Sequence, residues 1–409
     1  MIRKLLTYEE AKRAVESHFK VAFLGEEEAV LLEAANRTLA LDIVSLIDIP
    51  AYSTAKVNGY ALKVTDTANA SEEKPVVLKV VGYIGAGDTP TIPIKPGEAV
   101  EVMAGAVLPE GVDAVVAAKD TNRVDNELQI YSVANPGENL LGKGSDIKKG
   151  TVVLQKGQVL GSSEIGVLAA LGYTQVTVQK IPMVAVFSVG SDVNELDKPL
   201  ALAKNNDLNS YCICTAVMEC GAKPVYLGVV AAEQQSLINV LKAALASCDV
   251  VIACGSESDV AEAAETLSKD AVVVNGVAVK PGKTFATAYL EGKPVFCLPS
   301  NPSVCLLMYQ LFVRTLVQRL SGRPPAGLKA VSAFAGAKLF GAKGSRSFQS
   351  VALEFDEQCR LIAQPIASAG AVSGLAEADG FVQLGENEQF VEVDQEVAVL
   401  LYRGLASKT

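Results

Sequence analysis

The feature that most constrains this chain is a regular alternation of strand-like and helix-like segments between residues 182 and 320. Apolar runs predict strands at 183–188, 224–229, 250–254 and 295–298, and helical periodicity predicts helices at 206–220, 233–246, 259–268 and 302–320. This order is typical of parallel strands joined by crossover helices. The runs at 184–187 and 250–253 are continuously apolar, as in strands covered on both faces. The sequence therefore predicts a doubly wound, mostly parallel α/β domain over residues 179–325.

The rest of the chain predicts three further parts, in keeping with a length of 409 residues that exceeds one ordinary core. Residues 48–146 alternate short β runs with Gly- and Pro-rich turns and predict a β-rich inserted lobe. The flanks, 1–47 and 147–178, would then form an elongated connecting domain. After a Pro pair at 324–325, renewed short β runs predict a C-terminal β domain over 326–409.

Composition narrows the possible partners and the compartment. A net charge of −10 argues against general binding of nucleic acid, which needs a basic face. No run of 18 apolar residues predicts a membrane span, and Met1–Leu6 leads directly into a capping box of Thr7 and Glu10 instead of an apolar leader segment. The eight Cys are scattered and indicate small buried side chains instead of a disulfide framework. We therefore expect a cytoplasmic protein.

Small polar residues follow three of the predicted strands. These loops are 188–192 (Ser-Val-Gly-Ser-Asp), 255–258 (Gly-Ser-Glu-Ser) and 299–303 (Pro-Ser-Asn-Pro-Ser), and the last places Asn301 as the N-cap of a helix. We call them the strand-end loops. Any one of them is compatible with an ordinary turn. Because the carboxyl ends of parallel strands meet at one edge, the three together predict a shared cleft for an anionic ligand.

A fourth segment, Lys280–Thr284, carries a Pro-Gly turn between two Lys. Two ammonium groups beside a tight turn suit a phosphate or another oxyanion. The alternative is a solvated hairpin with no ligand.

Other candidate sites are weak. His18 is the only histidine and has no Cys or carboxylate cluster near it in sequence, which favours a surface residue over a ligand. Cys212 and Cys214 are two residues apart and do not share a helix face. No phosphate-binding or dinucleotide-binding Gly motif follows a strand, since Gly82–Gly87 is too irregular. A zinc site or a Cys–His nucleophile is therefore not predicted.

In this order, the motifs resemble those of the MoeA family of molybdopterin molybdenumtransferases and of the similar gephyrin domain. The family carries Ser-Thr-Gly-Asp-Glu, Asp-x-Asn, Gly-Gly-x-Ser-x-Gly, Lys-Pro-Gly-Lys-Pro and Pro-Gly-Asn-Pro-x-Ser. The corresponding stretches here are Ser188–Asp192, Asp207–Asn209, Gly255–Val260, Lys280–Thr284 and Pro299–Val304. The likeness continues upstream at Asp48–Tyr52, Asn58–Ala61, Met103–Pro109, Gly111–Val116, Gly137–Asn139 and Gly144–Asp146.

The resemblance implies the family's fold and activity, in which adenylylated molybdopterin loses AMP and molybdate is left on the dithiolene sulfurs. It implies catalytic roles for residues 58, 146 and 192, with Asp146 and Asp192 as ligands of Mg²⁺. It also implies a homodimer, in which one subunit's pterin domain meets the partner's β-rich lobe, and contacts with other proteins of molybdenum cofactor biosynthesis. The substrate-binding residues implied are Ser188, Gly190, Asp207, Asn209, Gly255, Ser256, Ser258, Lys280, Gly282, Lys283, Pro299, Asn301 and Pro302.

Several polar positions of the family have changed character. Asn58 stands where the family has Asp, and an amide brings no negative charge for a cation. Val260 replaces the last Gly of the Gly-Gly-x-Ser-x-Gly loop, and Ser345 and Ser350 replace the two Arg of a Gly-Arg-x-x-Phe-x-Arg motif. These departures motivate a second hypothesis, a catalytically impaired relative that acts as a pterin-binding carrier or a protein-interaction scaffold.

Overall fold

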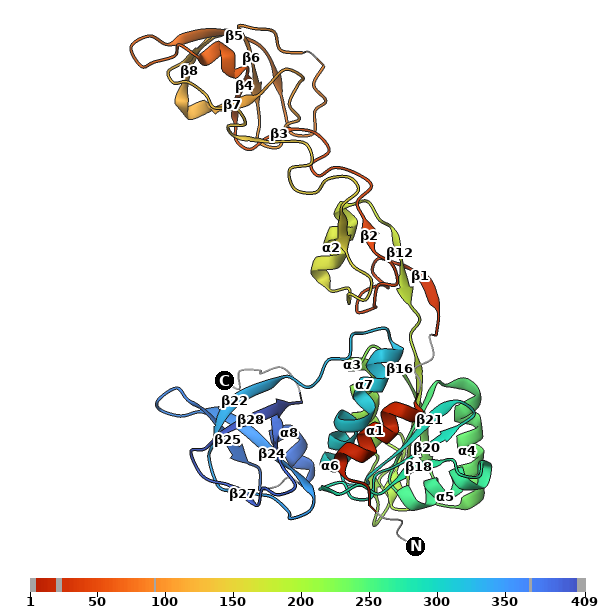
Figure 1. Cartoon of the computed structure of the whole chain (residues 1–409). Coiled ribbons are helices and arrows are strands. Elements are labelled where there is room, and N and C mark those ends of the chain that lie inside the picture. The colour runs from red at the N-terminus through yellow and green to blue at the C-terminus, as the bar shows by residue number, and fades with distance from the viewer. Residues whose placement is uncertain (1–4, 20–23, 92, 368–369, 403–409) are drawn as a thin grey trace. The chain divides into compact units, whose positions relative to one another are not determined.

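The computed structural model describes residues 5–19, 24–91, 93–367 and 370–402 (Figure 1). Met1–Lys4, part of the N-terminal segment in which no apolar leader was predicted, lie outside these ranges. The chain divides into two compact units. The larger comprises Met1–Ala40, Gly157–Ser162 and Gln175–Thr409, and the smaller comprises Leu41–Lys156 and Ser163–Thr174. No helix within the described ranges is both long enough and apolar enough to span a membrane.

The larger unit contains the predicted α/β domain, built on a sheet of six strands in the order β16-β13-β17-β21-β20-β18. The first four strands are parallel, and β20 and β18 are antiparallel additions that the alternation pattern did not reveal. The strands are β13 (Met183–Val189), β16 (Lys223–Val230), β17 (Val250–Cys254), β18 (Val272–Asn275), β20 (Ala286–Leu290) and β21 (Lys293–Leu298). A pair of two-residue strands, β14 (Val193–Asn194) and β15 (Asn205–Asn206), lies beyond β13.

Helices cover both faces of this sheet, so the predicted doubly wound arrangement is confirmed. Successive residues of β13 point to opposite faces: Val184 and Val186 pack with α1, α3 and the helices after residue 302, whereas Ala185 and Phe187 pack with α4 and α5. Both faces of the central strands are buried, which explains their continuous apolar runs. The helices are α1 (Tyr8–His18), α3 (Asn209–Glu219), α4 (Gln234–Ser247), α5 (Glu257–Leu267), α6 (Pro302–Met308) and α7 (Arg314–Leu320).

Two helices differ from their expected form or place. The capping box of Thr7 and Glu10 is present and starts α1, as predicted. However, Tyr8, Ala11 and Val15 of α1 are buried in the core of the α/β domain, although the sequence analysis assigned this segment to the connecting domain. The predicted helix 302–320 is interrupted by a π-helical turn at Tyr309–Val313 between α6 and α7.

The C-terminal part of the larger unit is a β domain, as predicted. Its sheet has the order β19-β24-β25-β22-β28-β26, and β24 also pairs with β26, which closes the sheet on itself. The elements are β19 (Val279–Lys280), β22 (Ala330–Ala335), β23 (Leu339–Phe340), β24 (Arg346–Phe355), β25 (Leu361–Pro365), α8 (Val372–Glu377), β26 (Gly380–Leu384), β27 (Phe390–Val391) and β28 (Glu396–Leu401).

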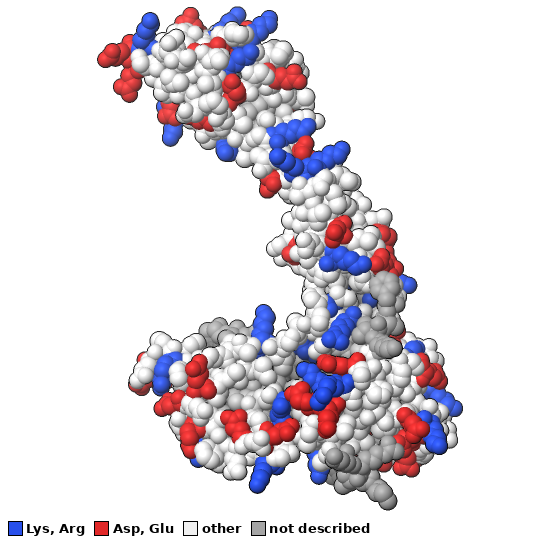
Figure 2. All heavy atoms as spheres, viewed as in Figure 1, with Lys and Arg blue, Asp and Glu red and all other residues white. Residues whose placement is uncertain are grey.

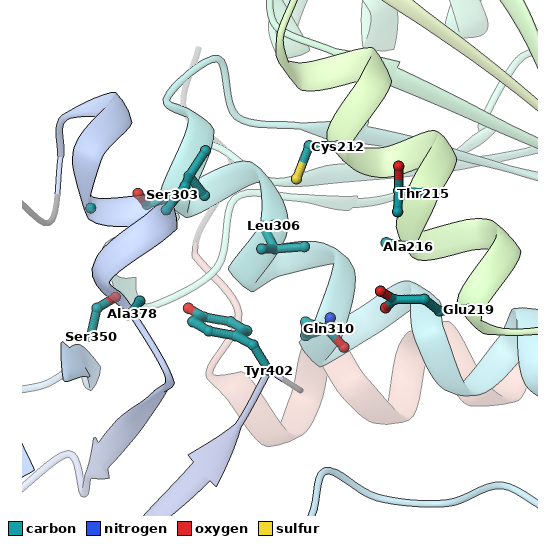
Figure 3. Close-up of a pocket in the computed structure, with 12 residues that line it drawn as sticks. Cys212, Thr215, Ala216, Glu219, Ser303, Leu306, Gln310, Ser350, Ala378 and Tyr402 are labelled. Carbon is teal, nitrogen blue, oxygen red and sulfur yellow. The ribbon is translucent and has the colours of Figure 1, made fainter. Parts of the chain in front are cut away.

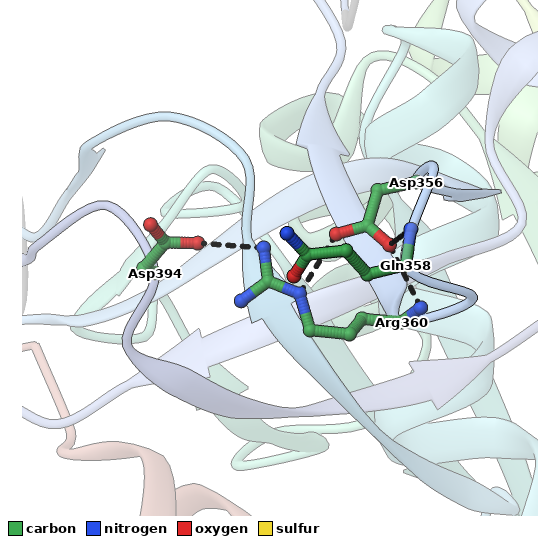
Figure 4. Close-up of polar contacts among 4 residues, drawn as sticks. All are labelled: Asp356, Gln358, Arg360 and Asp394. Carbon is green, nitrogen blue, oxygen red and sulfur yellow. Dashed lines mark hydrogen bonds and ion pairs between the residues drawn. The ribbon is translucent and has the colours of Figure 1, made fainter.

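An ion-paired turn joins β24 to β25 (Figure 4). The carboxylate of Asp356 accepts hydrogen bonds from the backbone N–H groups of Gln358 and Arg360, at 2.9 and 2.8 Å, and from the Arg360 guanidinium at 2.7 Å. These bonds, led by the backbone N–H of Arg360, lower the pKa of Asp356 from its ordinary value. Arg360 also lies over the ring of Phe334. The turn is therefore held by its own side chains and has no need of a ligand.

The smaller unit is β-rich, and its main sheet has the order β7-β4-β6-β5-β9-β8. Leu62, Leu128 and Ile130 are fully buried in its own core. The elements are β2 (Ile43–Val44), β3 (Thr54–Ala55), β4 (Gly59–Leu62), the 3₁₀ turn Val64–Thr67, β5 (Val76–Ile84), β6 (Glu98–Val102), β7 (Ala114–Ala117), the 3₁₀ turn Ala118–Asp120, β8 (Thr121–Val124), β9 (Glu127–Ile130), β10 (Leu140–Leu141), β11 (Val152–Leu154) and α2 (Ser162–Ala170).

The predicted connecting domain is shared between the units. A two-stranded pairing of β1 (Glu26–Val30) with β12 (Gln175–Gln179) belongs to the larger unit, whereas β2, β11 and almost all of α2 belong to the smaller one.

Lys, Arg, Asp and Glu side chains are interspersed over the described surface of both units in the view of Figure 2. The four predicted domain boundaries stay predictions.

Candidate functional site

The three strand-end loops meet at one edge of the sheet, as predicted. The backbone N–H of Gly255 donates to the carbonyl of Leu298 at 2.8 Å. Gly255 has a φ of +93°, and a Cβ on it would lie 2.8 Å from the carbonyl oxygen of Val189 and 3.7 Å from the Cβ of Ser300. Only glycine fits this position, because all three loops approach its Cα.

Helix α3 joins the same edge. The side-chain amide of Asn209 donates to the carbonyl of Ser300 at 2.7 Å, so the first turn of α3 holds the 299–303 loop. The Oδ1 atom of Asn209 is buried and has no hydrogen-bond partner within the described part of the chain. Ser256, which precedes α5, has the left-handed conformation with φ of 47°. A non-glycine residue in that region costs about 1 kcal/mol or more, and such strain concentrates at ligand-binding turns.

Asp207 and Ser188 are buried behind the strand-end loops, and their contact with a substrate stays a prediction. Asp207 is 1% exposed and Ser188 is 2% exposed. The Asp207 carboxylate accepts from the Ser188 hydroxyl at 2.6 Å, from the backbone N–H of Ser210 at 3.1 Å and from the Tyr226 hydroxyl at 3.0 Å. A buried carboxylate with three donors is a structural anchor. Pro299 is buried as well, so all three residues shape the loops from behind.

The segment Lys280–Thr284 is not a solvated hairpin. Val279 and Lys280 form β19, which pairs in parallel with Arg346 and Ser347 of β24 and so links the α/β domain to the C-terminal sheet. A Cβ on Gly282, whose φ is +118°, would lie 2.5 Å from the sulfur of Met308 in α6. The Thr284 hydroxyl donates to the Glu257 carboxylate at 2.7 Å. The segment therefore lies against the 255–258 loop, and the side chains of Lys280 and Lys283 remain exposed.

A cavity of about 930 Å³ lies beside α5, and we call it the α5 cavity. Ser258 and Lys283, both predicted as substrate-binding residues, line it together with Glu257 and Thr284. Glu262 and Glu265 also line the cavity, and neither was among the predicted site residues. The missed signal is their spacing: Ser258, Glu262 and Glu265 lie four and three residues apart and so share one face of α5.

The predicted catalytic positions lie in different units. Asp192 is exposed on the 188–192 loop of the larger unit. Asn58 and Asp146 are exposed in the smaller unit, where the Oδ1 of Asn58 accepts from the backbone N–H of Ala104 at 2.8 Å. Across residues 5–19, 24–91, 93–367 and 370–402, no group of three His, Cys, Asp or Glu side chains could hold a metal ion. A metal site built from protein ligands alone is therefore not found in the ranges described.

The weak candidates stay weak. His18 is exposed and its ring bonds to the carbonyl of Ala14. All eight Cys are free thiols, so the expectation of no disulfide framework is confirmed. Burial raises the pKa of Cys212 and of Cys214 to about 11, so both thiols are neutral near pH 7 and poor nucleophiles.

Known proteins resemble this chain over nearly its whole length. Three family descriptions match in order: the MoeA N-terminal region (domain I and II) over residues 6–172, a probable molybdopterin binding domain over 185–319, and the MoeA C-terminal region (domain IV) over 332–402. A molybdopterin molybdenumtransferase of Bacillus subtilis (strain 168) is 31% identical, across 98% of this chain and 95% of the relative. The chain belongs to the MoeA family.

Solved structures agree with this MoeA-family assignment. A molybdopterin biosynthesis MoeA protein from Pyrococcus horikoshii is 36% identical, with a TM-score of 0.88, over 98% of this chain and 100% of that one. A second structure from the same organism is 27% identical, with a TM-score of 0.82 over the same shares of both chains. A molybdopterin molybdenumtransferase of Nostoc sp. (strain PCC 7120) is 33% identical over 73% of this chain and 70% of the relative. The family resemblance inferred from the motifs is thus confirmed, and it extends into the C-terminal domain.

Proposed function

We propose that this MoeA-family chain is a molybdopterin molybdenumtransferase that takes adenylylated molybdopterin and molybdate, releases AMP and leaves molybdenum on the dithiolene sulfurs. The observation that carries the proposal is the contact of the strand-end loops around Gly255, beside the two exposed Lys of Lys280–Thr284. Relatives that align with nearly the whole chain or most of it bear the name of this activity.

The α5 cavity is the part of the larger unit in which we place the phosphates of the substrate. Free backbone N–H groups at the start of α5 and the ammonium of Lys283 favour an anion there. Glu257, Glu262 and Glu265 line the same cavity and would repel it. In this proposal Lys283 holds the phosphate, and a cation that arrives with the substrate offsets the charge of the three carboxylates.

A Mg²⁺ ion fits this arrangement only if the substrate phosphates supply some of its ligands. Mg²⁺ is commonly bound through one or two carboxylates together with substrate phosphates, and it supplies charge neutralisation at the phosphate that is cleaved. In the larger unit, Asp192 offers such a carboxylate from the 188–192 loop. Asp146 in the smaller unit stays a predicted second ligand, and Asn58 stays a predicted catalytic residue.

The second hypothesis, an impaired carrier or scaffold, rests on the sequence departures such as Asn58 alone, and no comparison supports it. The named relatives are transferases, and the α5 cavity is open and lined by the predicted Ser258 and Lys283. We therefore propose the enzyme and keep the scaffold only as an outcome of the test below.

The direct test is release of AMP from adenylylated molybdopterin with Mg²⁺ and molybdate present. We expect turnover by the native chain and a loss in kcat/KM of about 10- to 100-fold in Lys283→Ala, since a charge-assisted contact to the phosphate is removed. Lys242→Ala, which removes an exposed Lys from α4, is the matched control and should leave the rate unchanged. Retained pterin binding without any AMP release by the native chain would contradict the enzyme and favour the scaffold.

We also propose a homodimer and a cytoplasmic location. The family resemblance supports the dimer. Eight free thiols support a reducing compartment. Light scattering on the purified chain should give twice the monomer mass.

A further inference from the structure

A second cavity, of about 270 Å³, lies between α3, α6 and the C-terminal domain, and we call it the α3–α6 cavity (Figure 3). It shares no lining residue with the α5 cavity. One wall is a single face of α3, formed by Cys212, Thr215, Ala216 and Glu219 at helical spacing. Its volume is close to the lower end of the range for small-ligand sites.

The α3–α6 cavity is elongated and has two polar ends. Glu219 lies seven positions after Cys212 on α3, and Gln310, in the π-helical turn that follows α6, lies seven positions after Ser303, so each wall is roughly 10 Å long. Figure 3 shows Ser303 and Cys212 at one end and Glu219 and Gln310 at the other, with Leu306 between them. A molecule that fills the space therefore has an apolar middle and a polar group at each end.

The charges of the lining favour a cation at the Glu219 end. Among the described residues that line the cavity, Glu219 is the one with a formal charge. Burial raises the pKa of Cys212 to about 11 and that of Tyr402 to about 12, so neither supplies an anion near pH 7. Gln310 is 6% exposed, and its Oε1 accepts from the Arg314 guanidinium at 3.1 Å, which leaves its amide nitrogen as a possible donor.

The Ser303 end has an unsatisfied group. The hydroxyl oxygen of Ser303 is buried and has no hydrogen-bond partner among residues with a described position. A buried hydroxyl without a partner costs about 1–3 kcal/mol, which a ligand with a hydroxyl or an amide would recover once the Ser303 side chain rotates toward the cavity. Thr215 and Glu219 are exposed, so the cavity is open to solvent along α3.

We propose that the α3–α6 cavity is a binding site for a small, elongated organic amine. Its ammonium group pairs with Glu219, its apolar middle lies against Leu306 and Ala216, and its far hydroxyl or amide bonds to Ser303. Because Ser303 belongs to the 299–303 loop, an occupant would also contact the back of a strand-end loop. Binding itself does not depend on the proposed enzymatic activity, and it is tested without turnover.

The probe is tyramine, whose ammonium and phenol hydroxyl lie at opposite ends of an apolar linker. Its binding to the full chain is measured by calorimetry and by ligand-observed NMR. Two comparison compounds keep nearly the same length and change the charge: tyrosol is neutral, and 4-hydroxyphenylacetate is an anion. We expect a millimolar or lower Kd for tyramine, weaker binding of tyrosol and no binding of the anion.

Two variants locate the site. Glu219→Gln should weaken tyramine binding by about fivefold, because the pair is exposed to solvent, whereas Glu233→Gln at the start of α4 should not change it. Thr215→Phe should abolish binding by filling the cavity from an exposed position, and Met218→Phe, at an exposed position of α3 that does not line the cavity, should leave it intact. Equal binding of the three compounds, no binding of tyramine, or a Kd unchanged in both Glu219→Gln and Thr215→Phe would overturn the proposal.

Discussion

At the scale of single residues, Asp207 organises the region behind the strand-end loops. In the protein interior its carboxylate accepts hydrogen bonds from the Ser188 hydroxyl, the Ser210 N–H and the Tyr226 hydroxyl. In Asp207→Asn, an NH2 group replaces one carboxylate oxygen, so a donor faces a donor and at least one hydrogen bond is lost. We expect the free energy of unfolding to fall by about 2–3 kcal/mol. Urea unfolding checks the value.

A milder variant separates the contributions to the Asp207 network. Tyr226→Phe removes one donor and leaves the carboxylate with two, so we expect a loss of about 1 kcal/mol. If Asp207→Asn were no more destabilising than Tyr226→Phe, the anchor role of the carboxylate would be wrong.

Tyr402 predicts a specific response to alkaline pH. Burial raises its pKa to about 12, against an opposing effect of the Ser350 hydroxyl. Between about pH 10 and 12 the unfolded tyrosine ionises while the folded one keeps its proton. The unfolded state then binds fewer protons, so stability falls as pH rises through this window.

The stability of the Tyr402→Phe variant should fall less steeply with pH in this window. The difference in slope should be up to about 1.4 kcal/mol in the free energy of unfolding per pH unit. Urea unfolding of both proteins at several pH values between 9.5 and 11.5, roughly the window in which tyrosine titrates, measures it. Tyr83→Phe is the control, since Tyr83 is 57% exposed. Parallel pH profiles for the native chain and Tyr402→Phe would refute the assignment.

At the scale of elements, the start of α6 joins two parts of the larger unit. Asn301 caps the helix by accepting from the N–H of Val304 at 3.3 Å, and its amide donates to the carbonyl of Gly370 at 3.1 Å. Asn301→Ala loses both bonds and should cost about 1–2 kcal/mol of stability. Asn301→Asp keeps the cap and loses only the donor to Gly370, so it should cost less. Differential scanning calorimetry distinguishes the two variants. An equal loss of stability in both would show that the cap contributes nothing to stability.

At the scale of the whole molecule, the two units have separate hydrophobic cores. Leu128 is fully buried in the smaller unit and Leu241 in the larger one. Because each core can melt by itself, we expect two thermal transitions. Leu128→Ala should lower the midpoint of only one transition, and Leu241→Ala that of only the other. In each case we expect the free energy of unfolding of the affected unit to fall by about 2–5 kcal/mol. A single transition that both variants shift equally would show instead that the units unfold together.

The sequence by itself determined the features that depend on near neighbours. Continuous apolar runs marked β13 and β17, the capping box marked the start of α1, and polar residues after successive strands marked the loops that meet at Gly255. Parallel strands must end at a common edge, so the meeting of these loops followed from strand direction alone.

Only the tertiary structure decided which polar groups are available to a ligand. Asp207 and Lys283 are equally polar in the sequence, yet packing buries the first under three donors and leaves the second exposed at the α5 cavity. The antiparallel strands β18 and β20, the pairing of β19 with β24 and the α3–α6 cavity were likewise beyond prediction. Each arises from contacts between segments distant in the chain, and local periodicity carries no information about such pairing.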